Sequence, residues 1–178
     1  MVVRCKRCRS FSTSGIRVKY IRIVRHAKSA DATSAQSDHD RQLAPRGQRD
    51  GAIMQEWFAK QSHPIEWVWT SSAIRAQETA EFVAAATHAR TVAEPALYLA
   101  DAATIVDIIR GTPPDVESIA VVAHNPGLTH LTNLLGAESV TDNLVTFGTA
   151  LFGLENDWAQ LVPGYCHFVS LHTPKTKT

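Results

Sequence analysis

The chain has 178 residues, of which 44% are hydrophobic and 20% are charged, and its formal net charge is +1. This composition is typical of a folded globular protein rather than a disordered or fibrous one, and the length suits one domain. The near-neutral charge argues against a nucleic-acid partner, since binding to a phosphate backbone requires a basic face. No apolar run approaches the roughly 20 residues of a membrane span, so we expect no membrane partner either.

Residues 1–17 form a basic leader that we exclude from the predicted fold. The leader is rich in Arg and Ser, and the first acidic residue of the chain is Asp31. This composition is typical of an organellar transit peptide; a disordered basic tail, or a start codon placed too far upstream, explains it equally well. We therefore expect either a cytoplasmic location or, if the leader is a transit peptide, a mitochondrial or plastid matrix.

The three cysteines do not indicate a disulfide framework in a chain of this size. Cys5 and Cys8 form a Cys-x-x-Cys pair, but a structural zinc ion requires four ligands and no second pair follows. Cys166 stands alone in a strand-like segment, and we expect it in the core. We predict no metal site and no cofactor.

Strand-like and helix-like segments alternate over residues 18–174, the predicted single domain. In chain order, the predicted elements are strand 18–24, helix 45–61, strand 65–69, helix 73–87, strand 90–93, helix 102–109, strand 119–123, helix 126–134, and strands 144–154 and 166–171. Pro45 and Pro126 suit the start of a helix, and Gly111 suits the end of one. The alternation predicts an α/β fold, a three-layer αβα sandwich around a mostly parallel, doubly wound sheet.

Polar side chains follow three of the predicted strands. The first strand leads into Arg25 and His26, the second into 70–72 with Arg75 shortly after, and the fourth into His124 and Asn125. In open α/β sheets, ligands bind beyond the carboxyl ends of the strands. We therefore expect these side chains to form one site.

Two arginines and two histidines match the chemistry of phosphoryl transfer. The planar guanidinium groups of Arg25 and Arg75 can bind phosphate oxygens bidentately. One neutral imidazole can attack phosphorus, and the other, kept near its own titration range, can donate a hydrogen bond to an equatorial oxygen. Phosphoryl transfer requires little beyond positioning and charge stabilisation, and this set supplies both without a metal.

Five segments, in the same order, resemble those of the histidine phosphatase (phosphoglycerate mutase-like) superfamily. The segment 23–29 is similar to its Arg-His-Gly signature, with Ala27 in place of Gly. The other similar segments are 40–43 with Arg46-Gly47, 70–80, 121–127 and 146–150. The resemblance covers residues 20–171, implies a phosphoglycerate mutase-like fold, and is nearest to the short SixA-like phosphohistidine phosphatases, which lack lid insertions.

The resemblance also implies a role for each site residue. His26 is the nucleophile, Arg25 and Arg75 form the phosphate clamp, and His124 is the second histidine of the pocket. Ser29 and the backbone of Asn125 are further candidate phosphate contacts. The alternative for the two histidines is that they cap strands and hydrogen-bond within the core.

The chain departs from the superfamily at the general acid. The superfamily places a carboxylic acid between the second arginine and the second histidine, where this chain offers only Glu94 and Asp101, neither in a clear acid motif. General acid catalysis contributes about 10²- to 10⁴-fold and matters most for alkoxide leaving groups. Ala32 also stands where many members carry a phosphate-binding Asn. These departures favour protein phosphohistidine as the substrate over a sugar phosphate.

Two other functions remain open. The first is a broad-specificity phosphomonoesterase that acts on small phosphoesters, with Glu94 or Asp101 as its acid. The second is a weakly active phosphate-binding adaptor domain. His39, between Asp38 and Asp40, resembles a metal cluster, but we expect it in a solvated loop because no fourth ligand is near in the sequence.

Overall fold

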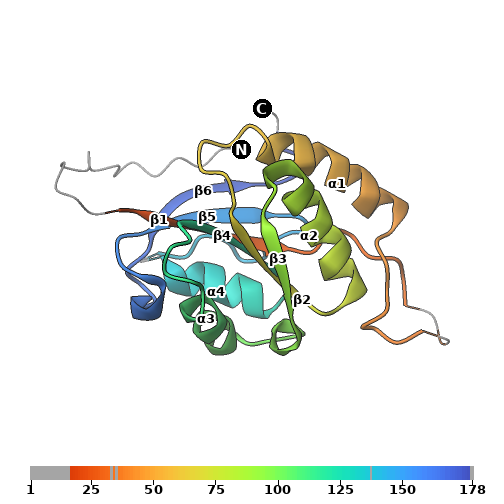
Figure 1. The fold of residues 1–178 in the computed structure, drawn as a ribbon. Helices are drawn as coiled ribbons and strands as arrows, with labels where there is room; N and C mark the ends of the chain where they lie inside the picture. Colours follow the sequence, from red (N-terminus) through yellow and green to blue (C-terminus); the bar gives the residue numbers. More distant parts are fainter. Residues whose placement is uncertain (1–16, 33, 35, 137, 177–178) are drawn as a thin grey trace.

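The computed structural model describes residues 17–32, 34, 36–136 and 138–176. Within them, strands and helices alternate for most of the chain (Figure 1). The elements are β1 (Lys19–Arg25), α1 (Pro45–Phe58), β2 (Trp67–Ser71), α2 (Ile74–Thr87), β3 (Arg90–Glu94), η1 (Pro95–Leu97), α3 (Ala102–Arg110), β4 (Ser118–Ala123), α4 (Gly127–Leu135), β5 (Thr149–Leu154), η2 (Trp158–Gln160) and β6 (His167–His172). Residues 1–16 of the basic leader, with its Cys-x-x-Cys pair, lie outside the described residues.

The strands form one six-stranded sheet in the order β3-β2-β4-β1-β5-β6. The pairs β2·β3, β2·β4 and β1·β4 are parallel, whereas β5 pairs antiparallel with both β1 and β6. The sheet is therefore mixed, with its parallel part built by the helix-connected strands. Antiparallel pairing begins at β5, although helix α4 lies between β4 and β5.

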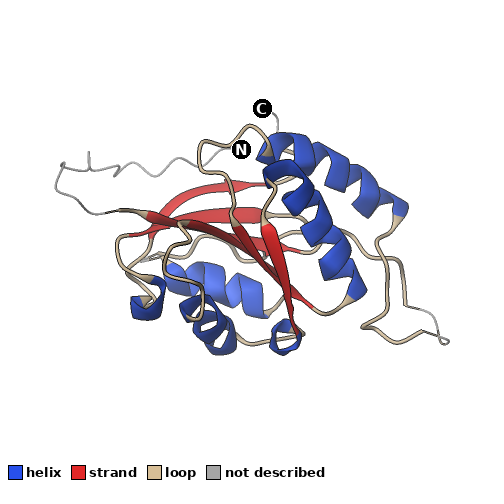
Figure 2. Cartoon of the chain, in the orientation of Figure 1, coloured by secondary structure: helices blue, strands red, loops and turns tan. Residues whose placement is uncertain are grey.

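Helices cover both faces of the sheet (Figure 2), so the predicted three-layer sandwich is confirmed. The α1/α2 side buries Met54, Phe58 and Val83 against Val24 and Val122. The α3/α4 side is a second core, in which the following residues take part: Ile21, Ile23, Ile105, Ile109, Ile119, Val121, Leu128 and Leu131. Successive residues of β1 and β4 point to opposite faces, which explains why β4 is apolar from Ile119 to Ala123 and why both Ile23 and Val24 of β1 are buried.

The predicted element boundaries differ from the structure in two places that matter for the site. The second strand runs over Trp67–Ser71 instead of 65–69, so it ends at Ser71. The predicted strand 144–154 is wrong in its first half, because only Thr149–Leu154 pairs with β1. Residues 144–148 form a turn in which Phe147 has a φ of 54° and donates its backbone N–H to the carbonyls of Arg25 and His26.

Other expectations concern the core and the surface. Cys166 is buried, as expected, and belongs to the α3/α4-side core. Trp67 and Trp69 point to the same side of β2, where Trp67 is buried and Trp69 packs against the core. In the part of the chain that the structure describes, no helix has the length and apolar character that crossing a bilayer requires.

Candidate functional site

Three neighbouring parallel strands end together at one edge of the sheet. Strand β4 lies between β1 and β2, and its Val122 is opposite both Val24 and Thr70. His26 and His124 follow β1 and β4 directly, and β2 ends at Ser71. The predicted convergence of these strand ends is therefore seen in the structure. The short loop after β2 leads into α2, whose first turn carries Arg75.

His26 is held in one tautomer by two hydrogen bonds. Its Nδ1 lies 2.7 Å from the backbone oxygen of Ala27, which can only accept, so Nδ1 carries the hydrogen. Its Nε2 lies 3.4 Å from Nε of Arg75, which can only donate, so Nε2 presents its lone pair. The ring is 9% exposed. A nearly buried imidazole whose free lone pair faces a guanidinium group can act as a nucleophile toward an anion bound there.

His124 lies beside His26, with 5.0 Å between the ring centroids. Its Nε2 is 2.8 Å from Oγ of Ser71, while its Nδ1 is buried and has no hydrogen-bond partner. The edge of the Tyr98 ring packs against it, with 5.5 Å between the centroids. Because buried polar atoms are almost always paired, the unpaired Nδ1 marks a position that a ligand oxygen can satisfy.

Burial keeps both imidazoles neutral. Burial, together with the charges of Arg75, Arg25 and Arg41, lowers the pKa of His26 to about 4, against the bond to Ala27. Burial also lowers the pKa of His124 to about 3, helped by His26 and Arg75. The expectation that His124 titrates near its ordinary range is wrong, because sequence spacing does not reveal how deeply a side chain is buried.

Arg75 is buried and is held by one residue of the loop before α1. Its Nη2 donates to Oδ2 of Asp38 at 2.8 Å, and its Nη1 donates to the backbone oxygen of the same residue. Asp38 also accepts from Nη1 of Arg41 at 2.7 Å and from the hydroxyl of Tyr98 at 2.8 Å. Three side chains from three separate segments therefore meet at this carboxylate.

These contacts determine the charge state of Asp38. Desolvation raises the pKa of its carboxyl, but hydrogen bonds from Arg41, Tyr98 and Arg75 together outweigh this and hold the pKa well below its usual range. The same carboxylate, together with burial, raises the pKa of Tyr98. Asp38 is thus ionised and Tyr98 protonated at neutral pH.

Sequence reasoning missed Asp38, Arg41 and Tyr98 as members of this cluster, whereas Ser71 belongs to the segment 70–72 that was expected at the site. Arg41 lies in one of the segments that resemble the superfamily, which is a signal that could have indicated it. Ser71 lies at the end of a strand whose boundary was displaced by two residues. The sequence contains no local pattern that brings Tyr98 to Asp38, because 60 residues separate them.

Arg25 and Asn125 face a different part of the site from Arg75. Both donate to the backbone oxygen of Leu144, Arg25 at 2.9 Å and Asn125 at 3.0 Å. Nε of Arg25 and Oδ1 of Asn125 are buried without a hydrogen-bond partner. The positive charge of Arg25 still acts on His26, but no hydrogen bond joins the Arg25 guanidinium to either imidazole.

Ser29 and the two candidate acids are engaged elsewhere. Ser29 accepts from Nη2 of Arg41 at 2.8 Å. Glu94 caps η1 by accepting from the backbone N–H of Ala96, and Asp101 caps α3 by accepting from that of Thr104. The cap hydrogen bonds lower the pKa of Asp101, which is the opposite of what a general acid requires.

The loop that carries His39 is docked rather than fully solvated. His39 is half-buried, its Nε2 lies 2.9 Å from Oγ of Ser72, and its ring packs edge-on against Tyr98. Its backbone oxygen accepts from the N–H of Ile74. Among the described residues, no group of three or more His, Cys, Asp or Glu side chains is placed to hold a metal ion.

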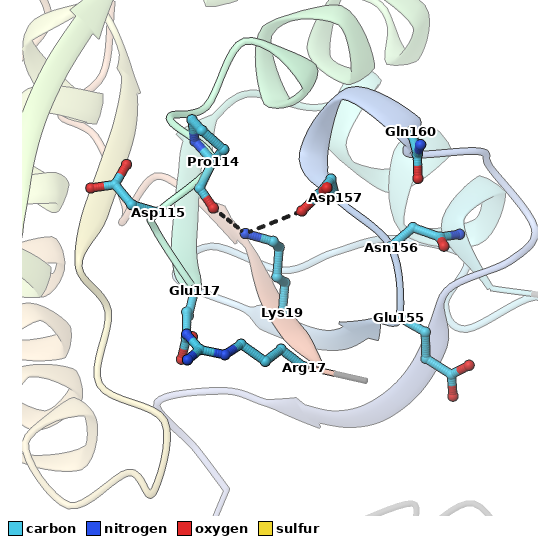
Figure 3. A pocket seen from close by; sticks show the side chains of 9 residues that line it. All are labelled: Arg17, Lys19, Pro114, Asp115, Glu117, Glu155, Asn156, Asp157 and Gln160. Atoms are coloured by element: carbon cyan, nitrogen blue, oxygen red, sulfur yellow. Dashed lines mark hydrogen bonds and ion pairs between the residues drawn. The ribbon is translucent and has the colours of Figure 1, made fainter. Parts of the chain in front are cut away.

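A hollow of about 430 Å³ lies at the opposite end of β1 from His26. Figure 3 shows Lys19 at its base, with Nζ bonded to the backbone oxygen of Pro114 at 2.6 Å and 3.9 Å from Asp157. Lys19 also bonds the backbone oxygen of Val116. These contacts join β1 to the segment before β4 and to η2, so Lys19 has a structural role and the hollow is separate from the histidine site.

Comparisons with known proteins agree with this geometry. A model of the histidine phosphatase superfamily (branch 1) matches residues 21–98. The uncharacterized protein Rv1276c of Mycobacterium tuberculosis is 30% identical over 161 residues, which cover 85% of this chain and 100% of that protein. The structure of the protein histidine phosphatase SixA in complex with tungstate is 25% identical, covers 87% of this chain and 97% of its own, and has a TM-score of 0.73. This chain belongs to the histidine phosphatase superfamily.

The fold of this histidine phosphatase is SixA-like. A Nakamurella multipartitia protein assigned as a phosphohistidine phosphatase SixA superimposes with a TM-score of 0.80 at 20% identity, covering 89% of this chain and 98% of its own. The resemblance found in the sequence and the expected phosphoglycerate mutase-like fold are therefore confirmed. As a histidine phosphatase, the chain is a phosphatase enzyme.

Proposed function

We propose that this histidine phosphatase hydrolyses phosphohistidine on a protein, through a phosphohistidine intermediate on His26 and without a metal. The observation that carries the proposal is the fixed tautomer of His26, whose Nε2 lone pair faces the Arg75 guanidinium at 3.4 Å. A phosphoryl group bound by Arg75 would lie against this lone pair. Positioning and charge stabilisation of this kind supply most of what phosphoryl transfer requires.

The proposed reaction has two steps that pass through the same pocket. In the first, His26 Nε2 forms a bond to phosphorus as the phosphorus–nitrogen bond of the substrate breaks, and the departing imidazole takes a proton from solvent. In the second, water attacks phosphorus, the bond to Nε2 breaks, and inorganic phosphate leaves. Arg75 and Arg25 offset the negative charge of the phosphoryl oxygens, and the unpaired Nδ1 of His124 can donate a hydrogen bond to one of them.

The carboxylates around the site support phosphohistidine over an alkyl phosphate. Glu94 and Asp101 are committed as helix caps, and Asp38 is kept ionised by its three side-chain partners. None of the three is prepared to protonate an alkoxide. An imidazole that solvent has protonated is a better leaving group than an alkoxide. Its departure therefore depends less on an acid supplied by the protein.

Rapid acid and alkaline quenching during turnover tests the nucleophile. With a ³²P-labelled phosphohistidine protein as substrate, we expect a transient label on the enzyme that is stable in base and labile in acid, and that maps to His26. His26→Ala should abolish the label and the turnover while retaining tungstate binding through the arginines. Label on another residue, or turnover by His26→Ala, contradicts the proposal.

A comparison of substrates tests the leaving group. We expect kcat/KM for a phosphohistidine protein to exceed that for serine phosphate and sugar phosphates by about 10²-fold or more, the low end of a missing general acid's contribution. Pretreatment with a chelator should leave these values unchanged. A preference for alkyl esters, together with loss of activity in Glu94→Ala or Asp101→Ala, would instead identify a small-molecule phosphomonoesterase.

A further inference from the structure

The guanidinium group of Arg75 has two edges that can each bind an anion, and Asp38 occupies only one. Asp38 accepts a hydrogen bond from Nη1 through its backbone oxygen and another from Nη2 through Oδ2. These two nitrogens form the end of the guanidinium group. The other edge consists of Nε–H and the second hydrogen of Nη2. Nε faces Nε2 of His26, so this second edge borders the proposed nucleophile.

Side-chain freedom explains why the occupied edge matters. An arginine side chain has many rotamers, and a guanidinium group that turned about its own bonds would offer its hydrogens at varying angles. Arg75 is 4% exposed, so few water molecules can replace a lost partner. Asp38 fixes the rotation of the group by binding both terminal nitrogens from one residue.

Asp38 is itself held in place from two other directions. Arg41 binds its Oδ1 at 2.7 Å and is anchored in turn on Ser29 Oγ and the backbone oxygen of Ala30. Tyr98 binds Oδ2 at 2.8 Å while its ring rests against His124. The Asp38 side chain lies in an exposed loop and is itself 47% exposed. Three partners nevertheless hold it in place.

We propose that Asp38 is a positioning residue, which acts through Arg75 by holding the end of its guanidinium group so that the remaining edge faces the phosphoryl group on His26. The inference rests on the proposed function, because it assumes that the phosphoryl group is bound between Arg75 and His26. It assigns Asp38 no proton transfer and no contact with the substrate. Its effect is on the orientation of two N–H donors at the moment of transfer.

The negative charge of Asp38 allows a positioning role to be distinguished from a role in phosphate binding. A negative charge next to Arg75 weakens the attraction of the pocket for an oxyanion, so its removal should leave oxyanion binding unchanged or tighter. Loss of orientation should instead slow the chemical step, because small misplacements of a positioned group cost up to about 10²-fold in rate. Asp38→Asn should therefore lower kcat while leaving the affinity for tungstate intact.

The test compares Asp38→Asn, Asp38→Glu and Tyr98→Phe in the full chain. We expect Asp38→Asn to lower kcat by about 10- to 100-fold, with a tungstate Kd no weaker than that of the wild type by calorimetry. Asp38→Glu should recover part of the lost kcat because it restores an ionised acceptor. Tyr98→Phe, which keeps the ring against His124 but removes one bond to Asp38, should lower kcat by a smaller factor.

Asp40→Asn is the matched control, since it removes the same charge two residues away from a side chain whose hydrogen-bond partners among the described residues are Ser37 and His39. An Asp38→Asn variant with the kcat of Asp40→Asn overturns the inference. So does a parallel loss of kcat, tungstate binding and thermal stability, which would indicate a structural role. If His26→Ala retains turnover, the proposed function itself fails, and this result is independent of the Asp38 variants.

Discussion

The two histidines of the site are buried side chains whose surroundings oppose a positive charge. His26 is 9% exposed and His124 is 2% exposed, and Arg75 contributes positive charge against the protonation of both. A neutral imidazole is the nucleophilic form. Burial among cations therefore keeps His26 neutral at pH values where an exposed histidine would be largely protonated.

NMR titration of the free enzyme tests this effect at the level of single residues. We expect the ring proton signals of His26 and His124 to stay at their neutral positions from pH 8 to pH 5, because the pKa values are lowered to about 4 and about 3. His26→Gln and His124→Gln variants assign the two signals. An inflection near pH 6.5 for either histidine would contradict the expected burial.

What the sequence could predict at this scale depends on how each residue is positioned. His26 and His124 follow strand ends directly, and Arg75 lies in the first turn of the helix after β2, so the order of elements was enough to bring them together. Asp38 lies in an exposed loop, and its role depends on contacts with Arg75 and Tyr98 that only the folded chain creates. Linear spacing contains no information on such contacts between segments.

Helix α4 begins at a close contact with the segment that carries Tyr98. A Cβ atom at Gly127 would lie 1.9 Å from the backbone oxygen of Ala100, closer than any real contact allows. Gly127 follows His124 by three residues and Ala100 follows Tyr98 by two. The absence of a side chain at Gly127 thus determines how near the Tyr98 segment can approach the second histidine.

Gly127→Ala should separate these two elements. We expect a loss of about 1–3 kcal/mol in the free energy of unfolding, as for other overpacked positions, and a lower kcat because Tyr98 moves away from His124 and Asp38. Denaturant unfolding and steady-state kinetics measure the two effects. Gly136→Ala is the control, since its Cβ would lie 3.4 Å from its nearest neighbour, and equal effects of the two substitutions would refute the expectation.

The elements were predictable where a hydrophobic pattern and its tertiary environment agree. Strand β4 is apolar throughout and lies inside the sheet, so its pattern and position match. The segment 144–148 has an equally strand-like composition, but Phe147 adopts a left-handed conformation and bonds the carbonyls of Arg25 and His26. The segment bonds these carbonyls instead of continuing the pairing of β5 with β1, and composition does not reveal such a contact.

The stability of the whole molecule should depend on pH through the same two histidines. Their pKa values are lower in the folded state than the ordinary 6.5 expected in the unfolded chain. The unfolded state therefore binds more protons between pH 6.5 and pH 4, and the folded state loses stability as the pH falls through this window. Above pH 6.5 this contribution is fully present.

Thermal unfolding between pH 7.5 and pH 4.5 tests the coupling. We expect the free energy of unfolding to fall by on the order of 1 kcal/mol per histidine for each pH unit below 6.5. The double variant His26→Gln/His124→Gln should show a flatter dependence over the same range. The lowered pKa of Asp38 acts only at more acidic pH, so it does not confuse the comparison. An equally steep dependence in the double variant would rule out the histidines as its source.

At the whole-molecule scale, the fold class was predictable because strands and helices alternate along the chain, whereas the direction of β5 was not, since β5 follows helix α4 and still runs antiparallel to β1. Its antiparallel pairing with β1 depends on the turn at 144–148, which had been assigned to the strand itself.

The groups proposed to handle the phosphoryl group and those that hold Arg75 in position belong to parts of the molecule with different freedom to change. His26, Ser71 and His124 are anchored at the ends of central strands, which the two cores hold in register. Asp38 and Tyr98 belong to surface connections, which tolerate insertions and substitutions far better than sheets do. Changes within residues 36–41 and 98–101 can therefore tune the orientation of Arg75 without displacing His26.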